Sequence, residues 1–207
     1  MKLYEAIEWH DKRAHEWEEL RLGVGKFTLE KQKICIEELN PKENESILDV
    51  GCGSGFFARE AAKRHAKVVA LDMSENMLKV AKEFAKRENL NIKFVIGDAK
   101  NLHFKDSSFD KLIAVDLIEH LTNPEIFIKE IGRVIKSGGK VVLAWPHSKS
   151  LYRVKYYFEK YILQREMPFT TWLSASLVEK WLKNSNFKVK RVSTYLGVTA
   201  ILVCEKL

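Results

Sequence analysis

The chain of 207 residues has little cysteine and no long apolar run. Its three cysteines, at positions 35, 52 and 204, are odd in number and widely spaced, which argues against a disulfide framework, and no C-x-x-C pair indicates zinc. No stretch approaches the roughly 20 apolar residues of a membrane-spanning helix. Residues 1–20 are rich in charge and lack a signal-peptide core. We therefore expect a cytoplasmic protein.

Glutamine is also scarce, with two residues against 26 lysines and 21 glutamates, a bias that leans toward a thermophile. Hydrophobic residues make up 46% and charged residues 30%, ordinary shares that exclude a disordered or collagen-like chain. The net charge of +7 is unevenly distributed, because residues 148–207 carry 11 basic and 4 acidic side chains while residues 1–147 carry equal numbers. We expect the excess positive charge of residues 148–207 either to be solvated or to contact an acceptor or a partner.

Alternating patterns from residue 46 onward predict an α/β fold with a parallel sheet and right-handed crossovers. Apolar runs predict strands at 46–50, 67–71, 92–96, 109–115 and 141–144, and helical patterns lie between them at 56–65, 74–88 and 123–138. Helices are also expected at 1–22, 28–39, 150–164 and 174–184. Two further strands, 187–195 and 198–204, form a closing hairpin that adds antiparallel character.

A glycine-rich turn follows the first predicted strand and reads Asp49-Val-Gly-Cys-Gly-Ser-Gly55. Glycine permits positive φ and lets a ligand touch the backbone. The turn opens a helix, whose N-terminal amides favour acceptor groups. A dinucleotide fingerprint, G-x-G-x-x-G, needs glycine at position 56, where Phe56 stands. This mismatch counts against a nicotinamide cofactor.

Acidic residues follow the next three predicted strands: Asp72, Asp98 and Asp116. The carboxyl ends of parallel strands form the edge where open α/β sheets bind ligands. A carboxylate there can accept both hydroxyls of a ribose. Any one of these acids could instead cap a turn or a helix, but all three beside the glycine turn predict a nucleoside ligand.

These ordered motifs resemble those of class I S-adenosylmethionine-dependent methyltransferases. The likeness is carried by the glycine turn, Asp72-Met73, Gly97-Asp98-Ala99 and residues 109–116. Segments 115–121 and 133–140 are similar to the small-molecule subgroup that includes ubiquinone- and menaquinone-methylating enzymes. The resemblance covers residues 46 to about 146.

The resemblance implies a Rossmann-like, doubly wound, mostly parallel sheet of seven strands with the last strand antiparallel. We expect residues 1–207 to form a single methyltransferase domain. Its parts are an N-terminal helical cap (1–40), a cofactor-binding core (41–147), a helical insertion after the fifth strand over the acceptor site (148–170), and a closing helix and hairpin (171–207).

The implied cofactor is S-adenosylmethionine, with S-adenosylhomocysteine as product. Asp49 would orient the glycine loop and meet the methionine amino group. Gly51, Gly53 and Gly55 would let the methionine and ribose lie on the backbone. Cys52 stands within the turn as a small residue, since no activating neighbour is visible.

The remaining cofactor contacts follow from the same resemblance. Asp72 would hold the ribose hydroxyls, with Met73 packing on the adenine. Asp98 would bind the adenine amino group, with Ala99 beside it. Residues 116 and 117 (Asp116 and Leu117) would line the reacting end.

Two further residues are candidates near the reacting end. Trp17 stands where relatives often carry a tyrosine over the cofactor. His120, beside Glu119, is the candidate catalytic base, because an imidazole has an unperturbed pKa near 6.5; a capping or packing role is the alternative. Methyl transfer from a sulfonium is an in-line displacement that requires no metal, and the sequence shows no metal-ligand cluster.

The insertion is basic and aromatic, with Lys149, Arg153, Lys155, Lys160 and Arg165 opposing Glu159. One interpretation is a lid whose apolar stripe packs on the core and whose basic face is solvated. The others are a lid over an aromatic or isoprenoid acceptor, and a surface for RNA or an anionic membrane. No DNA-binding motif is present.

The sequence thus predicts a methyltransferase acting on a small-molecule or lipid-like acceptor. The alternatives are an RNA (tRNA) nucleoside methyltransferase and a cofactor-binding regulatory subunit without its own acceptor chemistry.

Overall fold

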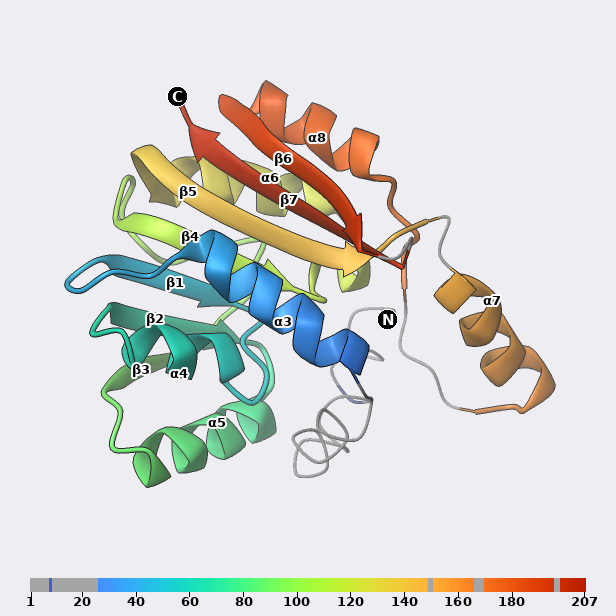
Figure 1. Cartoon of the computed structure of the whole chain (residues 1–207), viewed down its shortest axis with the longest axis horizontal. Coiled ribbons are helices and arrows are strands. Elements are labelled where there is room, and N and C mark those ends of the chain that lie inside the picture. Colours follow the sequence, from blue (N-terminus) through green and yellow to red (C-terminus); the bar gives the residue numbers. More distant parts are fainter. Residues whose placement is uncertain (1–7, 9–25, 149–150, 166–169, 196–197) are drawn as a thin grey trace.

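A seven-stranded sheet in the order β3-β2-β1-β4-β5-β7-β6 organises the chain (Figure 1). The computed structural model describes residue 8 and residues 26–148, 151–165, 170–195 and 198–207. The strands are β1 (Ser46–Val50), β2 (Lys67–Asp72), β3 (Ile92–Ile96), β4 (Phe109–Val115), β5 (Ile135–Pro146), β6 (Phe187–Tyr195) and β7 (Thr199–Lys206). Strands β1 to β5 pair in parallel, whereas β7 runs antiparallel to both β5 and β6. The predicted Rossmann-like sheet with an antiparallel last strand is confirmed.

Helices cover both faces of the sheet (Figure 1). They are α3 (Lys26–Leu39), α4 (Phe56–Ala62), α5 (Glu75–Arg87), α6 (Pro124–Val134) and α8 (Ala175–Asn184). Successive residues of β4 enter opposite cores: Ile113 packs with α3 and α4, whereas Leu112 and Ala114 pack with α6 and α8. Because both faces are covered, the central strands are apolar along most of their length.

Helix α5 begins as predicted, with the Ser74 hydroxyl accepting the backbone N–H of Met77 at 2.9 Å. The predicted end of α6 at Gly138-Gly139 is wrong. The helix ends at Val134, because Ile135 already pairs with Phe109 of β4 and starts β5. The glycines instead lie within this strand, where the pairing of β4 and β5 shifts register.

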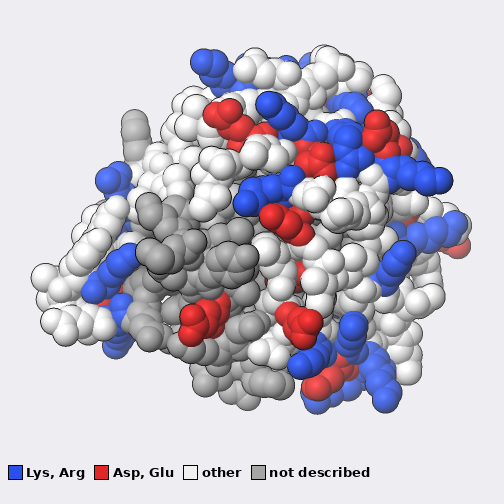
Figure 2. All heavy atoms as spheres, turned by 180° about the vertical axis from the view of Figure 1, so that it is seen from behind, with Lys and Arg blue, Asp and Glu red and all other residues white. Residues whose placement is uncertain are grey.

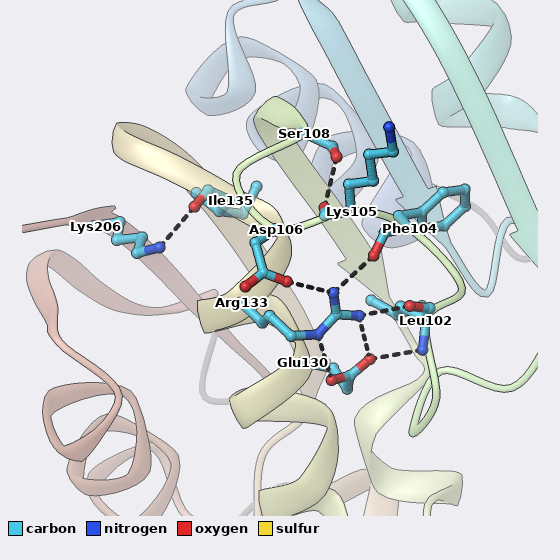
Figure 3. A network of polar contacts seen from close by, with 9 residues as sticks. All are labelled: Leu102, Phe104, Lys105, Asp106, Ser108, Glu130, Arg133, Ile135 and Lys206. Carbon is cyan, nitrogen blue, oxygen red and sulfur yellow. Dashed lines mark hydrogen bonds and ion pairs between the residues drawn. The ribbon is translucent and has the colours of Figure 1, made fainter.

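The connection between β3 and β4 is fixed by Arg133 of α6 (Figure 3). Its guanidinium donates to the carbonyls of Leu102 (2.6 Å) and Phe104 (2.6 Å) and to the carboxylates of Asp106 and Glu130 (both ion pairs under 3 Å). The hydrogen bonds from Arg133 hold the pKa of Glu130 below its usual range. This network fixes the loop that joins β3 to β4.

The chain after β5 leaves the helical layers. Helix α7 (Leu151–Tyr157) continues into one π-helical turn, η2 (Phe158–Ile162), so the helix predicted at 150–164 is confirmed in its main part. Figure 1 shows α7 beyond the carboxyl ends of the strands, apart from the layers on the sheet. Within the described ranges, every helix falls short of the length and apolar character that crossing a bilayer requires.

Candidate functional site

The glycine turn packs tightly on one side and is open on the other. The N–H groups of Gly51 and Cys52 donate to the carbonyl of Leu71 at 2.8 and 3.0 Å, so the turn folds onto the end of β2. Gly51 has a φ of +69°, and a Cβ there would lie 2.9 Å from the Leu117 side chain. Gly53 also has a positive φ, yet a Cβ there would meet nothing within 4 Å. Position 53 is therefore where a ligand can approach the backbone.

Asp49 lies beneath this turn and is almost fully buried. Its Oδ2 accepts the backbone N–H of Ala58 at 3.0 Å, which ties β1 to the first turn of α4. Burial raises the pKa of Asp49 to about 7, against the opposing effect of the Ala58 hydrogen bond. Asp49 is placed to orient the glycine loop, and its contact with a methionine amino group stays a prediction.

Asp72 joins the glycine turn to the start of α5. Its Oδ2 accepts the N–H of Gly53 at 2.8 Å, and its Oδ1 accepts the N–H of Ser74 at 2.9 Å. The side chain is half-buried, and Met73 beside it is half-buried as well. A carboxylate has about four acceptor positions, so Asp72 can accept ligand hydroxyls in addition to these backbone groups.

Asp98 follows β3 in a turn. Its Oδ1 accepts the N–H of Lys100 at 2.8 Å, the contact expected of a residue that caps a turn. The N–H of Gly97 donates to the backbone carbonyl of Asp72 at 3.1 Å, which connects this turn to the end of β2. Ala99 is buried in the core. The position of Asp98 fits the predicted contact with adenine, and its carboxylate also stabilises the turn in which it lies.

Asp116 and Leu117 meet the glycine turn from the end of β4. The N–H of Asp116 donates to the carbonyl of Ala144 at 2.8 Å, and its φ of +54° turns the chain away from the strand. Leu117 fills the space above Gly51. The structure therefore brings residues 51, 53, 72, 116 and 117 together at one edge, as predicted.

Lys31 of α3 is a site residue that sequence reasoning missed. Its ammonium forms an ion pair with Oδ2 of Asp116, and the lysine side chain is nearly buried. Burial acts to lower the pKa of Lys31, but the charge and hydrogen bond of Asp116 outweigh it and raise that pKa. Lys31 lies four residues before Cys35 and eight before Leu39, both fully buried, and this helical spacing was the available signal.

Glu119 completes this polar cluster. The residue is almost fully buried, and its Oε2 has no hydrogen-bond partner among the described residues. Burial first, and the charge of Asp116 second, raise the pKa of Glu119 well above its usual range. The buried Glu119 carboxyl therefore lies beside the Lys31–Asp116 ion pair at the end of β4.

Two other predicted residues have different outcomes. His120 is half-buried on the 3₁₀ turn η1 (Ile118–His120), which follows Asp116 in the chain. Its catalytic role stays a prediction. Trp17 lies outside the described residues.

Cys52 is buried in the turn, and burial raises the pKa of its thiol well above the usual value. The thiol is therefore uncharged at pH 7 and unsuited to nucleophilic chemistry. In the part of the chain that the structure describes, no group of three His, Cys, Asp or Glu side chains could hold a metal ion.

The edge fits a ligand that carries a ribose. Gly53 offers open backbone, and the half-buried Asp72 carboxylate lies directly beside it. The deeper carboxylates, of Asp49 and Glu119, are enclosed by protein.

Comparison with known proteins identifies the family to which this chain belongs. The family model described as a methyltransferase domain matches residues 48–143. Demethylmenaquinone methyltransferase from Staphylococcus haemolyticus is 35% identical over 189 residues, covering 83% of this chain and 76% of that protein. Ubiquinone biosynthesis O-methyltransferase from Coxiella burnetii is 37% identical over 106 residues, covering 51% of this chain. The match spans about half of that relative, 45% of its length.

Among solved structures, the fold is similar to that of a methyltransferase from Haloferax volcanii in complex with the Trm112 methyltransferase activator. The TM-score is 0.77 at 17% identity, and the match covers 95% of this chain and 96% of that chain. At this identity the similarity shows the fold alone.

Proposed function

Because the chain belongs to the class I S-adenosylmethionine-dependent methyltransferase family, we propose that it transfers a methyl group to a small-molecule or lipid-like acceptor. The relative that supports this acceptor class is the demethylmenaquinone methyltransferase, whose match extends well beyond the cofactor-binding core. The observation that carries the proposal is the meeting of the open backbone at Gly53 with the Asp72 carboxylate.

S-adenosylmethionine supplies an activated methyl group on a sulfonium. The chain contributes positioning and a site from which water is excluded. In this proposal Asp72 accepts the ribose hydroxyls, while Met73, Asp98 and Ala99 form the adenine end. Asp49 holds the glycine turn in register with α4 through the N–H of Ala58.

The reacting end lies at Asp116 and Leu117, because Leu117 packs directly on Gly51. The Lys31 ammonium forms an ion pair with the Asp116 carboxylate at this end. His120 follows on the next turn and is the proposed base for an acceptor that must lose a proton. Burial raises the pKa of Glu119, and this enclosed carboxyl is not the proposed base.

The alternatives remain an RNA nucleoside methyltransferase and a cofactor-binding regulatory subunit. The match to demethylmenaquinone methyltransferase, at 35% identity over 83% of this chain, supports the small-molecule proposal over them.

The test combines calorimetric titration with S-adenosylmethionine and radiolabelled methyl transfer to fractionated cell extract. We expect Asp72→Asn to weaken cofactor binding at least tenfold, since it loses a charge-assisted acceptor, worth about 1.5–3 kcal/mol. Asp106→Asn is the matched control, because Asp106 is exposed and lies in the Arg133 network.

Equal affinity in Asp72→Asn and the wild type would remove Asp72 from the ribose site. Label in RNA, and not in small molecules or lipids, would replace the proposed acceptor. Cofactor binding without transfer to any fraction favours the regulatory subunit.

A further inference from the structure

The segment α7–η2 exposes large apolar side chains in a row. Val154 is 66% exposed, Phe158 52%, Tyr161 64% and Ile162 67%. One interpretation of the sequence packs the apolar stripe of this segment on the core, and the exposure of these four side chains shows that it is wrong for them. Exposed apolar patches of this kind mark surfaces that meet a partner or a membrane.

Basic residues share this surface. Arg153, Lys155 and Lys160 belong to the segment and Arg165 follows it, and Glu159 is the one acid between residues 151 and 165. Glu159 is already engaged by Arg165 at 3.3 Å and by Lys155 at 4.0 Å. The apolar row with these four cations is called the docking face below.

Figure 2 shows the segment projecting from the body of the molecule, with uncharged side chains outermost and Lys and Arg beside them. This arrangement suits a layer that is apolar inside and negatively charged at its surface.

The docking face is held in a fixed relation to the reacting end. Tyr156, on the opposite side of α7, is buried and packs edge-on against Trp172, with ring centroids 5.5 Å apart. The N–H of Thr171 donates to the carbonyl of Glu119 at 2.7 Å, and Leu173 accepts from the Trp145 indole at 3.0 Å. The chain following the segment is thus anchored beside η1 and the end of β5.

We propose that the docking face binds an anionic lipid bilayer, with Ile162 and its apolar neighbours entering the interface and the four cations meeting the headgroups. This inference rests on the proposed lipid-like acceptor, because it would bring the reacting end to the surface where such a molecule dissolves.

The aromatic contacts favour a bilayer over single-stranded RNA. Tyr157 and Tyr161 stack on each other, with centroids 5.9 Å apart and planes 12° from parallel. Their facing surfaces are therefore occupied, whereas RNA binding by stacking needs open aromatic faces. Val154, Ile162 and Leu163 are aliphatic and exposed, which suits acyl chains and offers a base no π-surface.

The experiment is co-sedimentation of the full chain with vesicles of phosphatidylcholine, alone or mixed with phosphatidylglycerol. We expect binding to the mixed vesicles only, weakening as salt is raised. Ile162→Ser should lower the partition coefficient about tenfold or more, since burial of such a side chain is lost. Ile126→Ser is its matched control, because Ile126 is an exposed isoleucine of α6, and it should leave binding unchanged.

A second pair of variants tests the contribution of charge to vesicle binding. Lys155→Gln should lower binding about fivefold, the effect of one basic residue near an anionic surface. Lys82→Gln, at an exposed position of α5, should have no effect.

Absence of vesicle binding in a chain that still binds S-adenosylmethionine would overturn the inference, as would unchanged binding by Ile162→Ser. Retention on oligouridylate without vesicle binding would overturn it in favour of RNA. Methyl transfer to a lipid fraction without vesicle binding would refute the docking face alone. Vesicle binding sensitive to residues 155 and 162, with transfer only to water-soluble acceptors, would support the docking face and refute the proposed acceptor.

Discussion

The carboxyl edge of the parallel strands and the docking face use their side chains in opposite ways. At the edge, Asp72 accepts N–H groups of its own chain, and Gly51 leaves the room that Leu117 fills. On the docking face, Val154 and Ile162 point to solvent and contribute little to the core. Contacts within the fold therefore account for the residues at the edge. The exposed apolar residues of the docking face are instead accounted for by a binding partner outside the chain.

The largest expected effect comes from crowding the edge. Gly51→Ala should lower the free energy of unfolding by about 3 kcal/mol, because it combines a left-handed φ with overpacking against Leu117. Gly138→Ala is the matched control: its φ of +74° is similar, but no atom lies within 4 Å of the new Cβ. It should cost only about 1 kcal/mol. Urea unfolding measures both, and equal losses would show that the edge is not tightly packed.

A smaller loss is expected from the network beside the edge. Arg133→Ala should destabilise the fold by about 2 kcal/mol, since the carbonyls of Leu102 and Phe104 and the Glu130 carboxylate lose their donor. Asp106→Asn removes only an exposed ion pair and should cost less than about 0.5 kcal/mol. Thermal unfolding compares the two variants, and a neutral Arg133→Ala would contradict the assigned role.

The buried carboxyl at the edge should make stability depend on pH. With a pKa of about 7 in the folded state against about 3.9 when unfolded, Asp49 keeps a proton that the unfolded chain has lost. The free energy of unfolding should therefore fall as pH rises from about 4 to 7, and this contribution should level off above that.

Asp49→Asn should remove part of this pH dependence. The fall in the free energy of unfolding between about pH 4 and 7 should shrink by at least ~1.4 kcal/mol, which corresponds to one pKa unit. Glu119 contributes with the same sign, because its pKa is also raised, so some slope should remain. Denaturant titrations across this pH range test the prediction. A slope identical in the variant and the wild type would contradict the burial of an Asp49 proton.

The smallest effect is expected on the docking face. Ile162→Val should change the free energy of unfolding by less than about 0.5 kcal/mol, as usual for surface positions. Ile128→Val in α6, at a fully buried position, should cost about 1 kcal/mol. A comparable loss at both isoleucines would place Ile162 inside the fold and remove the contrast between the two regions.

Sequence reasoning succeeded where local patterns and chain contacts agree. The glycine turn, the strand ends at Asp72 and Asp116, and the Ser74 cap lie where expected, because each depends on neighbouring residues. The boundary at Val134 was missed because a long-range pairing with Phe109 overrides the local glycine signal. The roles of these residues toward the cofactor stay predictions.

Local pattern did not settle the role of two features, one at the site and one on α7. Lys31 looked like one more helical lysine, and its position became meaningful only when α3 placed it against Asp116. The apolar stripe of α7 has helical spacing, but spacing alone does not tell a face that packs on the core from a face that remains in solvent.

The strand order has a consequence for folding during synthesis. Strand β7 follows β6 in the chain but lies between β5 and β6 in the sheet. Until residues 199–206 leave the ribosome, β5 has an open edge and β6 has no neighbour to join. An unpaired strand edge is a template for pairing with other chains. The nascent chain therefore carries an aggregation-prone edge on β5 until β7 is inserted between β5 and β6.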